Sequence, residues 1–392
     1  MSSESRMLTK KNRPRLIFVC QHISSDENRA QFNRVRFLCE HYCLYIIANG
    51  PVSSEACKNA KTVFFPPFGK KKFSFFSFIW GLWKVLQIVR KENIKQIYST
   101  YEPRTIFLAH ITAKLLKMTW ILDLWDDPEK GVLITKQRPG ALNRLIVFAK
   151  KVEFNLVKPC LKSADKIIIG LVPDRVIEKY SLCSSKILTI TNGINLQYDF
   201  QRQIGNRNIN NERFTIFYCG TVDRIRMEGL KDCVKIVLGQ LADLKIIVIG
   251  REETGGYSWL KDQLKDLGNR LILEVKGRQP YKKVIDAIDE SDICICPYPD
   301  KLDITATYPV KIFDYMMMGK PVVASSLTGI SRILTHGVDS LLFRPGRYDE
   351  MADCIINLYN SKPLRQKLSR NAKKNVLKYS WDSIHEKIYE FL

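Results

Sequence analysis

Long hydrophobic runs are missing from this 392-residue sequence. No window reaches the roughly 18 uninterrupted apolar residues that a membrane-spanning helix needs. The first 15 residues are polar and basic, so the sequence predicts no secretory signal. Its 20 glycines and 16 prolines follow no period, which excludes collagen-like and low-complexity chains. With 45% hydrophobic and 26% charged residues, the composition predicts packed cores, and the length predicts two domains.

The sequence also lacks the spacings typical of disulfide frameworks and metal sites. Its 11 cysteines are an odd number and include no Cys-x-x-Cys pair. The five histidines show no ligand spacing either. We therefore expect a reducing, cytoplasmic compartment and no metal site.

Acidic residues are scarce in the first half of the chain. Residues 1–190 hold 32 Lys and Arg against 15 Asp and Glu, a net charge of +17 out of +22 for the whole sequence. A positive electrostatic field of this size favours an anionic partner. The candidates are a nucleic acid, a membrane surface and a phosphorylated substrate. A basic surface that only aids solubility is the alternative. No nucleic-acid-binding motif accompanies the charge, so we expect no nucleic-acid partner.

Short β-branched runs alternate with amphipathic stretches along nearly the whole chain. This rhythm predicts βαβ units and parallel sheets. The expected strands are 16–20, 44–48, 97–100, 120–124, 166–169, 187–190, 215–219, 245–249, 271–275, 292–296, 321–324 and 340–343. The expected helices include 30–42, 77–92, 104–118, 142–162, 173–180, 349–360, 363–378 and 381–391.

The rhythm restarts after a polar stretch without periodicity at 201–213, which is typical of a linker. The fold class is therefore α/β, with two doubly wound Rossmann-like domains. We place them at 1–195 and 196–376, followed by a closing helical segment at 377–392. Ligands of such sheets bind beyond the carboxyl ends of the strands, so we expect the site in those loops, in a cleft between the domains.

The segment 307–325 carries the clearest chemical signal. Pro309 favours the start of a helix and Gly319 its end, which predicts a short helix between them. Lys311 would lie in the first turn, where the helix dipole disfavours a cation unless a phosphate binds there. Asp314 would share its face and accept hydrogen bonds from sugar hydroxyls. An ordinary Lys–Asp surface pair is the alternative.

Glycine turns follow several of the expected strands. Gly220 ends the first strand of the second half, and Arg224 and Arg226 lie in the loop after it. A guanidinium at such a place would neutralise a leaving diphosphate. Solvated loop arginines are the alternative. Similar turns occur at Gly250 and Gly277, each followed by an arginine.

Three carboxylates cluster at the end of the strand 120–124, namely Asp123, Asp126 and Asp127. Carboxylates at a strand end suit hydroxyl binding or proton transfer. They suit the capping of a following helix equally well.

An aromatic and basic stretch occupies residues 70–91. Its apolar core of 17 residues, interrupted by Lys84, is short for a membrane span. Its beginning combines Lys70 to Lys72 with aromatic residues, a pattern typical of an interfacial membrane contact. The aromatic residues are Phe73, Phe75, Phe76, Phe78 and Trp80. A buried crossover helix is the alternative.

In combination and order, these motifs resemble the retaining glycosyltransferases of glycosyltransferase family 4, the glycosyl transferases group 1, which have two Rossmann domains facing across a cleft (GT-B). The resemblance covers nearly the whole chain. Its motifs are ITNGIN (190–195), FYCGTVDR (217–224), KIIVIG (245–250), VKGRQPYKKVIDAIDESDICICPY (275–298) and YPVKIFDYMMMGKPVVAS (308–325). The ending YSWDSIHEKIYEFL (379–392) resembles the closing helices of that family, which cross back onto the first domain.

The resemblance implies the transfer of a sugar from a nucleotide sugar, UDP- or GDP-linked, to an acceptor hydroxyl without an essential metal. The basic first domain indicates a glycan or lipid-linked acceptor and a peripheral position on the cytoplasmic face of a membrane. Two alternatives keep the fold, a non-catalytic subunit and a nucleotide-sugar epimerase. The non-catalytic alternative is supported by Ala306, where the family has the first acid of its Glu-x7-Glu motif, and by Glu228, where it has a lysine.

The resemblance also implies roles for single residues. Asp314 matches the acid that binds the ribose, and the backbone from Thr307 to Val310 matches the turn that holds the diphosphate. Arg224 and Lys311 match basic residues at the diphosphate, and Asp126 lies in the acceptor-side segment. The expected donor-binding residues are Gly220, Gly250, Arg278, Thr307, Tyr308, Val310 and Asp314, and the expected catalytic residues are Arg224, Lys311 and Asp126.

Overall fold

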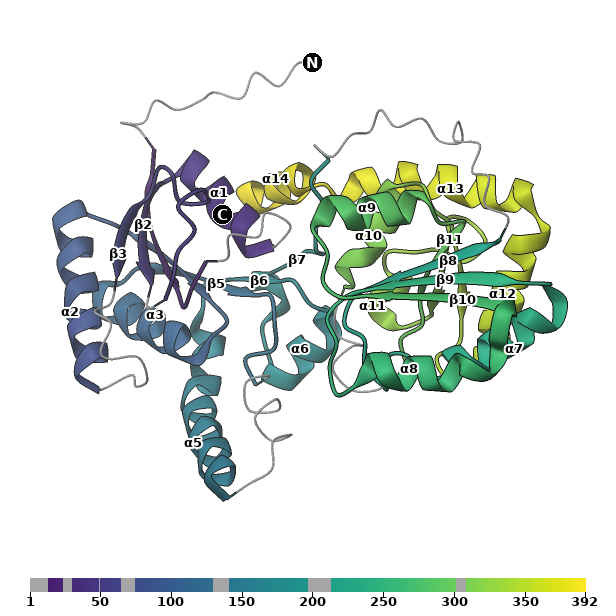
Figure 1. Ribbon diagram of the computed structural model, residues 1–392. Helices are drawn as coiled ribbons and strands as arrows, with labels where there is room; N and C mark the ends of the chain where they lie inside the picture. Colours follow the sequence, from purple (N-terminus) through teal and green to yellow (C-terminus); the bar gives the residue numbers. More distant parts are fainter. Residues whose placement is uncertain are drawn as a thin grey trace, which may run out of the picture. The chain divides into compact units, whose positions relative to one another are not determined.

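The computed structural model describes residues 13–23, 30–48, 50–64, 75–129, 141–196, 213–300 and 308–392. The chain forms two compact units, drawn in Figure 1. Unit 1 comprises Met1–Thr191 together with Ile384–Leu392, and unit 2 comprises Asn192–Ser383. For comparison, the sequence placed the domain boundaries after residues 195 and 376.

Unit 1 is built on a seven-stranded sheet in the order β3-β2-β1-β4-β5-β6-β7, in which every pair is parallel. Its strands are β1 (Arg15–Cys20), β2 (Cys43–Ala48), β3 (Lys61–Phe64), β4 (Gln96–Thr100), β5 (Thr119–Leu124), β6 (Lys166–Ile169) and β7 (Ile187–Thr189). Six of them were expected. The sequence analysis missed β3, a four-residue strand at the edge of the sheet that begins with a lysine.

Helices cover both faces of this sheet (Figure 1). The helices of unit 1 are α1 (Ala30–His41), α2 (Phe75–Glu92), α3 (Pro103–Leu116), α5 (Ala141–Val157) and α6 (Pro173–Tyr180), with short 3-10 turns at η1 (Lys158–Ser163) and η2 (Ser184–Lys186). The expected helix 142–162 ends at Val157, because Pro159 lacks the amide hydrogen that an α-helix would need there and η1 takes over. Val85, Ile106 and Phe154 join the helices to one face of the sheet through a common core.

The last helix, α14 (Trp381–Phe391), belongs to unit 1 from Ile384 onward. The ring of His385 stacks on Phe37 of α1 at a centroid distance of 4.6 Å. Lys166 Nζ donates to the Phe391 carbonyl at 2.7 Å. The end of the chain therefore returns to the first unit, as the resemblance implied.

Unit 2 repeats the plan with a six-stranded sheet in the order β10-β9-β8-β11-β12-β13, again parallel throughout. Its strands are β8 (Thr215–Cys219), β9 (Leu244–Ile249), β10 (Leu271–Lys276), β11 (Ile293–Cys296), β12 (Val322–Ser325) and β13 (Ser340–Phe343). All six were expected from their β-branched runs, which are largely buried except in β10, a half-exposed strand at the edge of the sheet.

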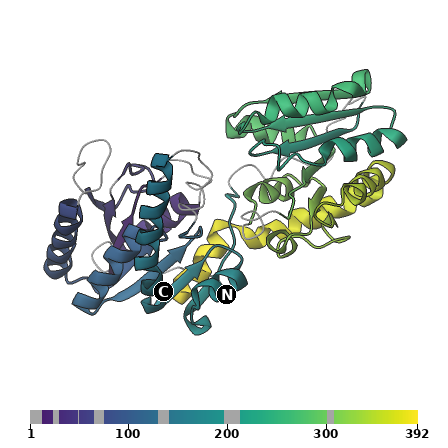
Figure 2. The same ribbon diagram turned by 90° about the horizontal axis from the view of Figure 1, so that it is seen from below.

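The helices of unit 2 lie on both sides of its sheet (Figure 2). They are α7 (Leu230–Gln240), α8 (Gly256–Leu264), α9 (Tyr281–Asp289), α10 (Val310–Met317), α11 (Thr328–Ser331), α12 (Tyr348–Asn360) and α13 (Lys362–Val376), with 3-10 turns at η3 (Lys265–Arg270) and η5 (Leu377–Tyr379). α7 packs against α12, and α10 packs against α13.

Each sheet reverses its strand order once, and this fixes where a ligand can bind. In unit 1 the reversal lies between β1 and β4, and in unit 2 it lies between β8 and β11. The crevice at the carboxyl ends of two such strands is the usual ligand site of a doubly wound sheet. Among the described residues, no helix has the length and apolar character to cross a membrane.

Candidate functional site

The carboxyl end of β8 turns sharply through Gly220, directly beside the switch point of unit 2. Gly220 has φ +133°, a backbone conformation that favours glycine. A Cβ atom at Gly220 would lie 2.5 Å from Lys311 Nζ, and one at Gly250 would lie 1.6 Å from the Gly220 carbonyl oxygen. Glycine is therefore needed at both turns because side chain and backbone approach them too closely for any larger residue.

The helix predicted after Pro309 is α10. Pro309 is its N-cap with ψ 113°, and Gly319 follows its end with φ +62°. The Lys320 amide donates to the Tyr315 carbonyl at 2.9 Å, which closes the last turn. The prediction of a short helix between Pro309 and Gly319 is confirmed.

Lys311 in the first turn of α10 is only 8% exposed. Its Nζ has no hydrogen-bond partner in the described part of the chain. The ammonium lies 3.9 Å from the ring centroid of Tyr218 and 4.8 Å from that of Tyr298. The alternative of an ordinary surface pair with Asp314 is therefore wrong.

A buried ammonium without an acceptor is costly unless something replaces the lost water. The faces of Tyr218 and Tyr298 replace part of it, because an aromatic ring attracts a cation. Burial acts to lower the pKa of Lys311, whereas neighbouring tyrosine and cysteine side chains raise it through the charge that they carry when ionised. Burial raises the pKa of Tyr218, Cys219 and Cys296 as well, so these side chains are uncharged near neutral pH and do not offset the desolvation cost of the ammonium there. Lys311 thus holds a positive charge at the Gly220 turn that an incoming anion would satisfy.

Asp314 lies one turn further along α10. Its Oδ1 accepts a hydrogen bond from the Tyr281 hydroxyl at 2.7 Å. Burial raises the pKa of Asp314 to about 7, although the Tyr281 hydrogen bond acts in the opposite direction. Burial raises the pKa of the Cys219 thiol to about 11, and the nearby charges of Lys311 and Asp314 act on it with opposite signs, so both lie near the end of β8.

The loop after Gly220 holds the second cation of this site. Arg226 pairs with the buried carboxylate of Asp223, and its guanidinium lies 6.0 Å from the ring centroid of Tyr298. The same ring contacts Lys311, so Tyr298 joins the two cations. Arg224, which the sequence analysis favoured, is exposed. The sequence spacing could not decide which of the two arginines belongs to the site, because it does not show which of them forms an ion pair with Asp223.

The other expected donor residues lie around this turn and at the ends of neighbouring strands. Tyr308 is buried, and its carbonyl accepts from Asn192 Nδ2 at 2.8 Å. Val310 is exposed at the start of α10, and Arg278 is exposed after β10. Thr307 and Ala306 lie outside the described residues.

The three carboxylates that the sequence analysis singled out at the end of β5 have different surroundings. Asp123 is fully buried, forms an ion pair with Arg34 (Nε to Oδ2, 3.3 Å) and accepts from the Tyr98 hydroxyl. Burial raises its pKa to about 6, against the effects of Arg34 and Tyr98. Asp127 accepts from Lys179 at 2.6 Å and from the hydroxyl of the last residue of α6. Asp123 and Asp127 therefore stabilise the fold, and Asp126 is the half-buried carboxylate beside them.

Sequence reasoning missed Arg34 on α1. Its guanidinium is completely buried and lies 4.9 Å from the ring centroid of Trp125, the residue that precedes Asp126 in the sequence. None of its three side-chain nitrogens makes a hydrogen bond within the described residues. Nothing in the sequence distinguishes this buried arginine from an arginine on a solvent-exposed helix face.

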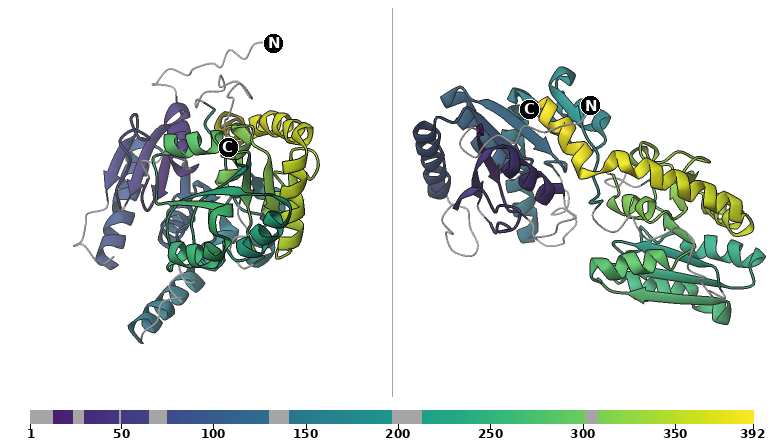
Figure 3. Two further views of the ribbon diagram at one scale, coloured as in Figure 1. Left: turned by 45° about the vertical axis from the view of Figure 1, so that its right-hand side comes forward. Right: turned by 90° about the horizontal axis from the view of Figure 1, so that it is seen from above.

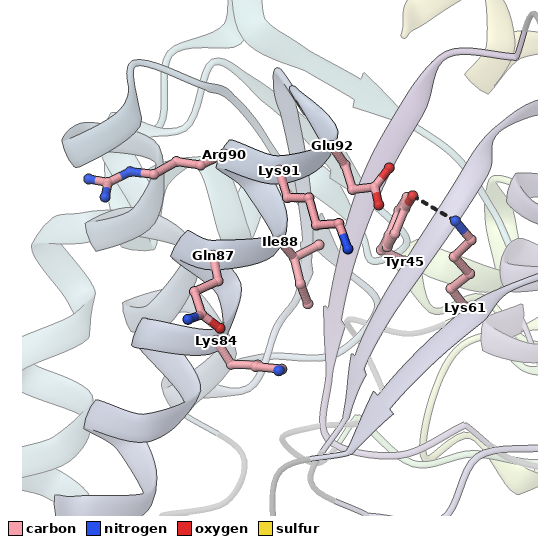
Figure 4. A pocket seen from close by; sticks show the side chains of 8 residues that line it. All are labelled: Tyr45, Lys61, Lys84, Gln87, Ile88, Arg90, Lys91 and Glu92. Atoms are coloured by element: carbon pink, nitrogen blue, oxygen red, sulfur yellow. Dashed lines mark hydrogen bonds between the residues drawn. The ribbon is translucent and has the colours of Figure 1, made fainter.

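A cavity of about 640 Å³ lies elsewhere on unit 1 (Figure 4). It is formed by the second half of α2 and by β2 and β3, and Lys61 Nζ donates to the Tyr45 hydroxyl inside it at 3.1 Å. The lining residues are Tyr45, Lys61, Lys84, Gln87, Ile88, Arg90, Lys91 and Glu92. Because Lys61 begins β3, this cavity lies away from the carboxyl edge of the sheet, and it is separate from the site of Asp126.

No group of three or more His, Cys, Asp or Glu side chains that would suit a metal ion occurs within the described ranges. The charged groups at the end of β8 are instead the cations Lys311 and Arg226 and two carboxylates, Asp314 and the Asp223 that pairs with Arg226. Such a set suits a ligand that carries both phosphate and hydroxyl groups.

A known protein family matches most of unit 2. Residues 213–361 match the sequence profile described as glycosyl transferases group 1. The match contains the Gly220 turn, Arg226, Lys311 and Asp314, so all the charged groups of the site lie inside the matched region.

Curated relatives extend the match beyond unit 2. An uncharacterized glycosyltransferase of Methanocaldococcus jannaschii is 25% identical over 226 residues, which cover 54% of this chain and 55% of that protein. The phosphatidyl-myo-inositol mannosyltransferase of Mycobacterium leprae is 22% identical over 178 residues, covering 44% of this chain and 45% of the relative. The chain thus spans about half the length of the curated relatives it matches.

Solved structures share the fold of nearly the whole chain. HepE from Anabaena, solved in complex with UDP, has a TM-score of 0.70 at 14% identity and covers 96% of this chain and 98% of its own. A glycosyltransferase from Rickettsia africae has a TM-score of 0.69 at 13% identity and covers 96% and 97%. The prediction of the GT-B fold, with two Rossmann-like domains, is confirmed.

Proposed function

We propose that this protein is a retaining glycosyltransferase that binds a nucleotide sugar at the carboxyl edge of the unit 2 sheet and transfers the sugar to an acceptor hydroxyl. The observation that carries the proposal is the buried ammonium of Lys311 at the Gly220 turn, which has no hydrogen-bond partner among the described residues. A buried charge that only two aromatic rings accompany in the described part of the chain suits a phosphate.

The diphosphate of the donor would lie between the Gly220 turn and the start of α10. The helix start contributes the positive end of its dipole and Lys311 contributes a full charge. Arg226 supplies a second full charge from the loop after β8. The ribose hydroxyls would donate to Asp314, which Tyr281 already holds in place.

The reaction breaks the bond between the anomeric carbon and the phosphate oxygen. The bond from the acceptor oxygen then forms on the same face of the sugar, and the departing phosphate oxygen takes the acceptor proton. Lys311, Arg226 and the α10 start stabilise the negative charge that develops on the diphosphate. This course needs no protein nucleophile.

The acceptor would bind to unit 1 near Asp126. The net charge of +17 in residues 1–190 supports a phosphorylated or lipid-linked glycan precursor on the cytoplasmic face of a membrane. The names of two relatives support the same class, the phosphatidyl-myo-inositol mannosyltransferase of Mycobacterium leprae and a putative teichuronic acid biosynthesis glycosyltransferase of Bacillus subtilis.

A panel of nucleotide sugars tests the donor half of the proposal. A ligand at 100 times its Kd stabilises the native state by about 2.7 kcal/mol, so a matching UDP- or GDP-linked sugar should raise the Tm by several degrees. If no nucleotide sugar raises the Tm, the proposal is wrong.

Turnover then separates the three activities compatible with the fold. Acceptor-dependent release of the nucleoside diphosphate, unchanged by EDTA, identifies a metal-independent transferase. An epimerised nucleotide sugar identifies an epimerase. Binding without any turnover identifies a non-catalytic subunit.

A further inference from the structure

The outer face of α5 is apolar. Leu145, Phe148, Val152 and Leu156 are 67%, 68%, 43% and 66% exposed. Steps of three and four residues place them along one side of the helix, and we call these four residues the α5 stripe. Phe154 is buried in the core of unit 1 instead.

The α5 stripe is exposed, whereas Phe154 and Val157 on the other side of α5 are buried in the core of unit 1. In Figures 1 and 3 the teal helix α5 extends away from the sheet of unit 1. A solvent-facing helix surface normally carries polar side chains, and a contiguous apolar patch marks an interaction site. The four side chains expose roughly 450 Å², which is little more than half of the roughly 800 Å² per partner in a stable protein interface. The stripe is therefore too small to hold a second copy of this chain by itself.

Basic residues accompany the α5 stripe. Residues 141–163 contain five Lys and Arg and a single acid, Glu153, which pairs with Arg104 at 2.8 Å. Arg144 and Lys151 are exposed and lie on one flank of the stripe by helix geometry. An apolar face bordered by Lys and Arg is the pattern of a helix that lies in the interface of an anionic membrane.

We propose that the α5 stripe docks unit 1 on an anionic lipid surface. The helix lies parallel to the surface, its four apolar side chains enter the boundary between headgroups and acyl chains, and Arg144 and Lys151 contact lipid phosphates. The proposal deepens the proposed function, on which its biological purpose rests, because it gives a route to a lipid-linked acceptor. Binding itself needs neither donor nor acceptor, so it fails or succeeds separately from the transferase activity.

This surface differs from the one that the sequence analysis favoured. Residues 65–74, which include Phe73 and the three lysines, lie outside the described residues, and the side chains of Phe75 and Phe76 are not described. A membrane contact by that segment stays a prediction. Variants of the two segments test the two surfaces independently.

Vesicle co-sedimentation of the full chain tests the proposal. The vesicles are phosphatidylcholine with about 30% phosphatidylglycerol, at low and at high salt, without any nucleotide. The parent should bind, and part of its binding should resist salt because apolar insertion is not screened. The triple variant Leu145→Ser, Phe148→Ser, Leu156→Ser should lose about tenfold or more in partition coefficient at high salt. Arg144→Gln with Lys151→Gln should lose binding chiefly at low salt.

A matched triple variant in unit 2 controls for the loss of apolar surface in general. Ile236, Ile272 and Leu377 are 40 to 44% exposed, and their replacement by serine should leave vesicle binding unchanged. Because all six side chains are exposed, both triple variants should keep the parental Tm. If the stripe triple variant melts at a lower temperature than the parent, the single variant Phe148→Ser is measured in its place. Three outcomes would each overturn the proposal. The parent protein does not bind anionic vesicles, the stripe variant binds them as well as the parent does, or the stripe mediates a dimer and not vesicle binding.

Discussion

Replacing Lys311 with methionine removes the ammonium and keeps most of the side chain that packs between Tyr218 and Tyr298. In the proposed reaction Lys311 stabilises the departing diphosphate, and loss of one such group costs about 10²–10³ in kcat. The ligand-free protein should respond in the opposite direction. Lys311→Met gives up cation–π contacts of about 1–2 kcal/mol but relieves a buried charge whose desolvation costs several kcal/mol. We expect an unchanged Tm or a rise of about 2–4 °C.

Lys320 provides the matched control, because it lies just beyond α10 and its Nζ donates to the carbonyls of Asp289 (2.7 Å) and Ser291 (2.9 Å). Lys320→Met should lower stability by about 2 kcal/mol and leave kcat unchanged. Steady-state release of nucleoside diphosphate and thermal melts without ligand measure both quantities for both variants. A parental kcat in Lys311→Met refutes the catalytic role. A fall in its Tm as large as that of Lys320→Met refutes the argument that the unpaired ammonium is a net cost.

Four further predictions concern the same site. Since burial raises the pKa of Asp314 to about 7, nucleotide affinity should weaken as the pH falls through about 7, and Asp314→Asn should be weak and nearly pH-independent in calorimetry. The raised pKa also means that the stability from this carboxyl is full below the unfolded pKa of about 3.8 and is lost as the pH rises through about 7, so Asp314→Asn should flatten that part of the Tm profile. Gly220→Ala should displace the Lys311 ammonium and weaken donor binding. The control Gly239→Ala, whose Cβ meets nothing within 4 Å, should bind the donor like the parent. Equal donor affinities of the two variants would contradict the steric argument. Arg226→Ala should lower kcat more than Arg224→Ala, and the reverse order would restore the role that the sequence gave to Arg224.

The strands of both sheets could be predicted from the sequence because a strand covered on both faces is apolar throughout. The strand β3 escaped because it lies at an edge, where four residues that begin with a lysine suffice. The end of α5 was placed five residues too late because its amphipathic pattern continues into η1, although Pro159 cannot continue the α-helix. For α5 the period of the pattern was interpreted correctly but its end was not, whereas β3 was missed because four residues are too few to show a period.

The candidate site was less predictable, because contacts between distant residues decide it. The spacing placed Lys311 in the first turn of a helix, but its burial comes from Tyr218 on β8 and Tyr298 after β11. The choice between two arginines depends on Asp223, which holds one of them. The stripe on α5 poses the same problem, since apolar residues occur on both sides of that helix and the sequence does not show which side the sheet covers.

The two units also differ in whether their buried cation has an acidic partner among the described residues, and this bears on the order of events. In unit 1 the carboxylates of Asp123 and Asp127 have cationic partners, Arg34 and Lys179, so they contribute to the fold before any ligand arrives. In unit 2 the ammonium of Lys311 is buried without a hydrogen-bond partner among the described residues, and the Gly220 turn keeps room for it. An anion that binds there gives the ammonium an acceptor that the described residues do not supply. The donor half of the site is therefore formed in advance, and donor binding should not require the acceptor.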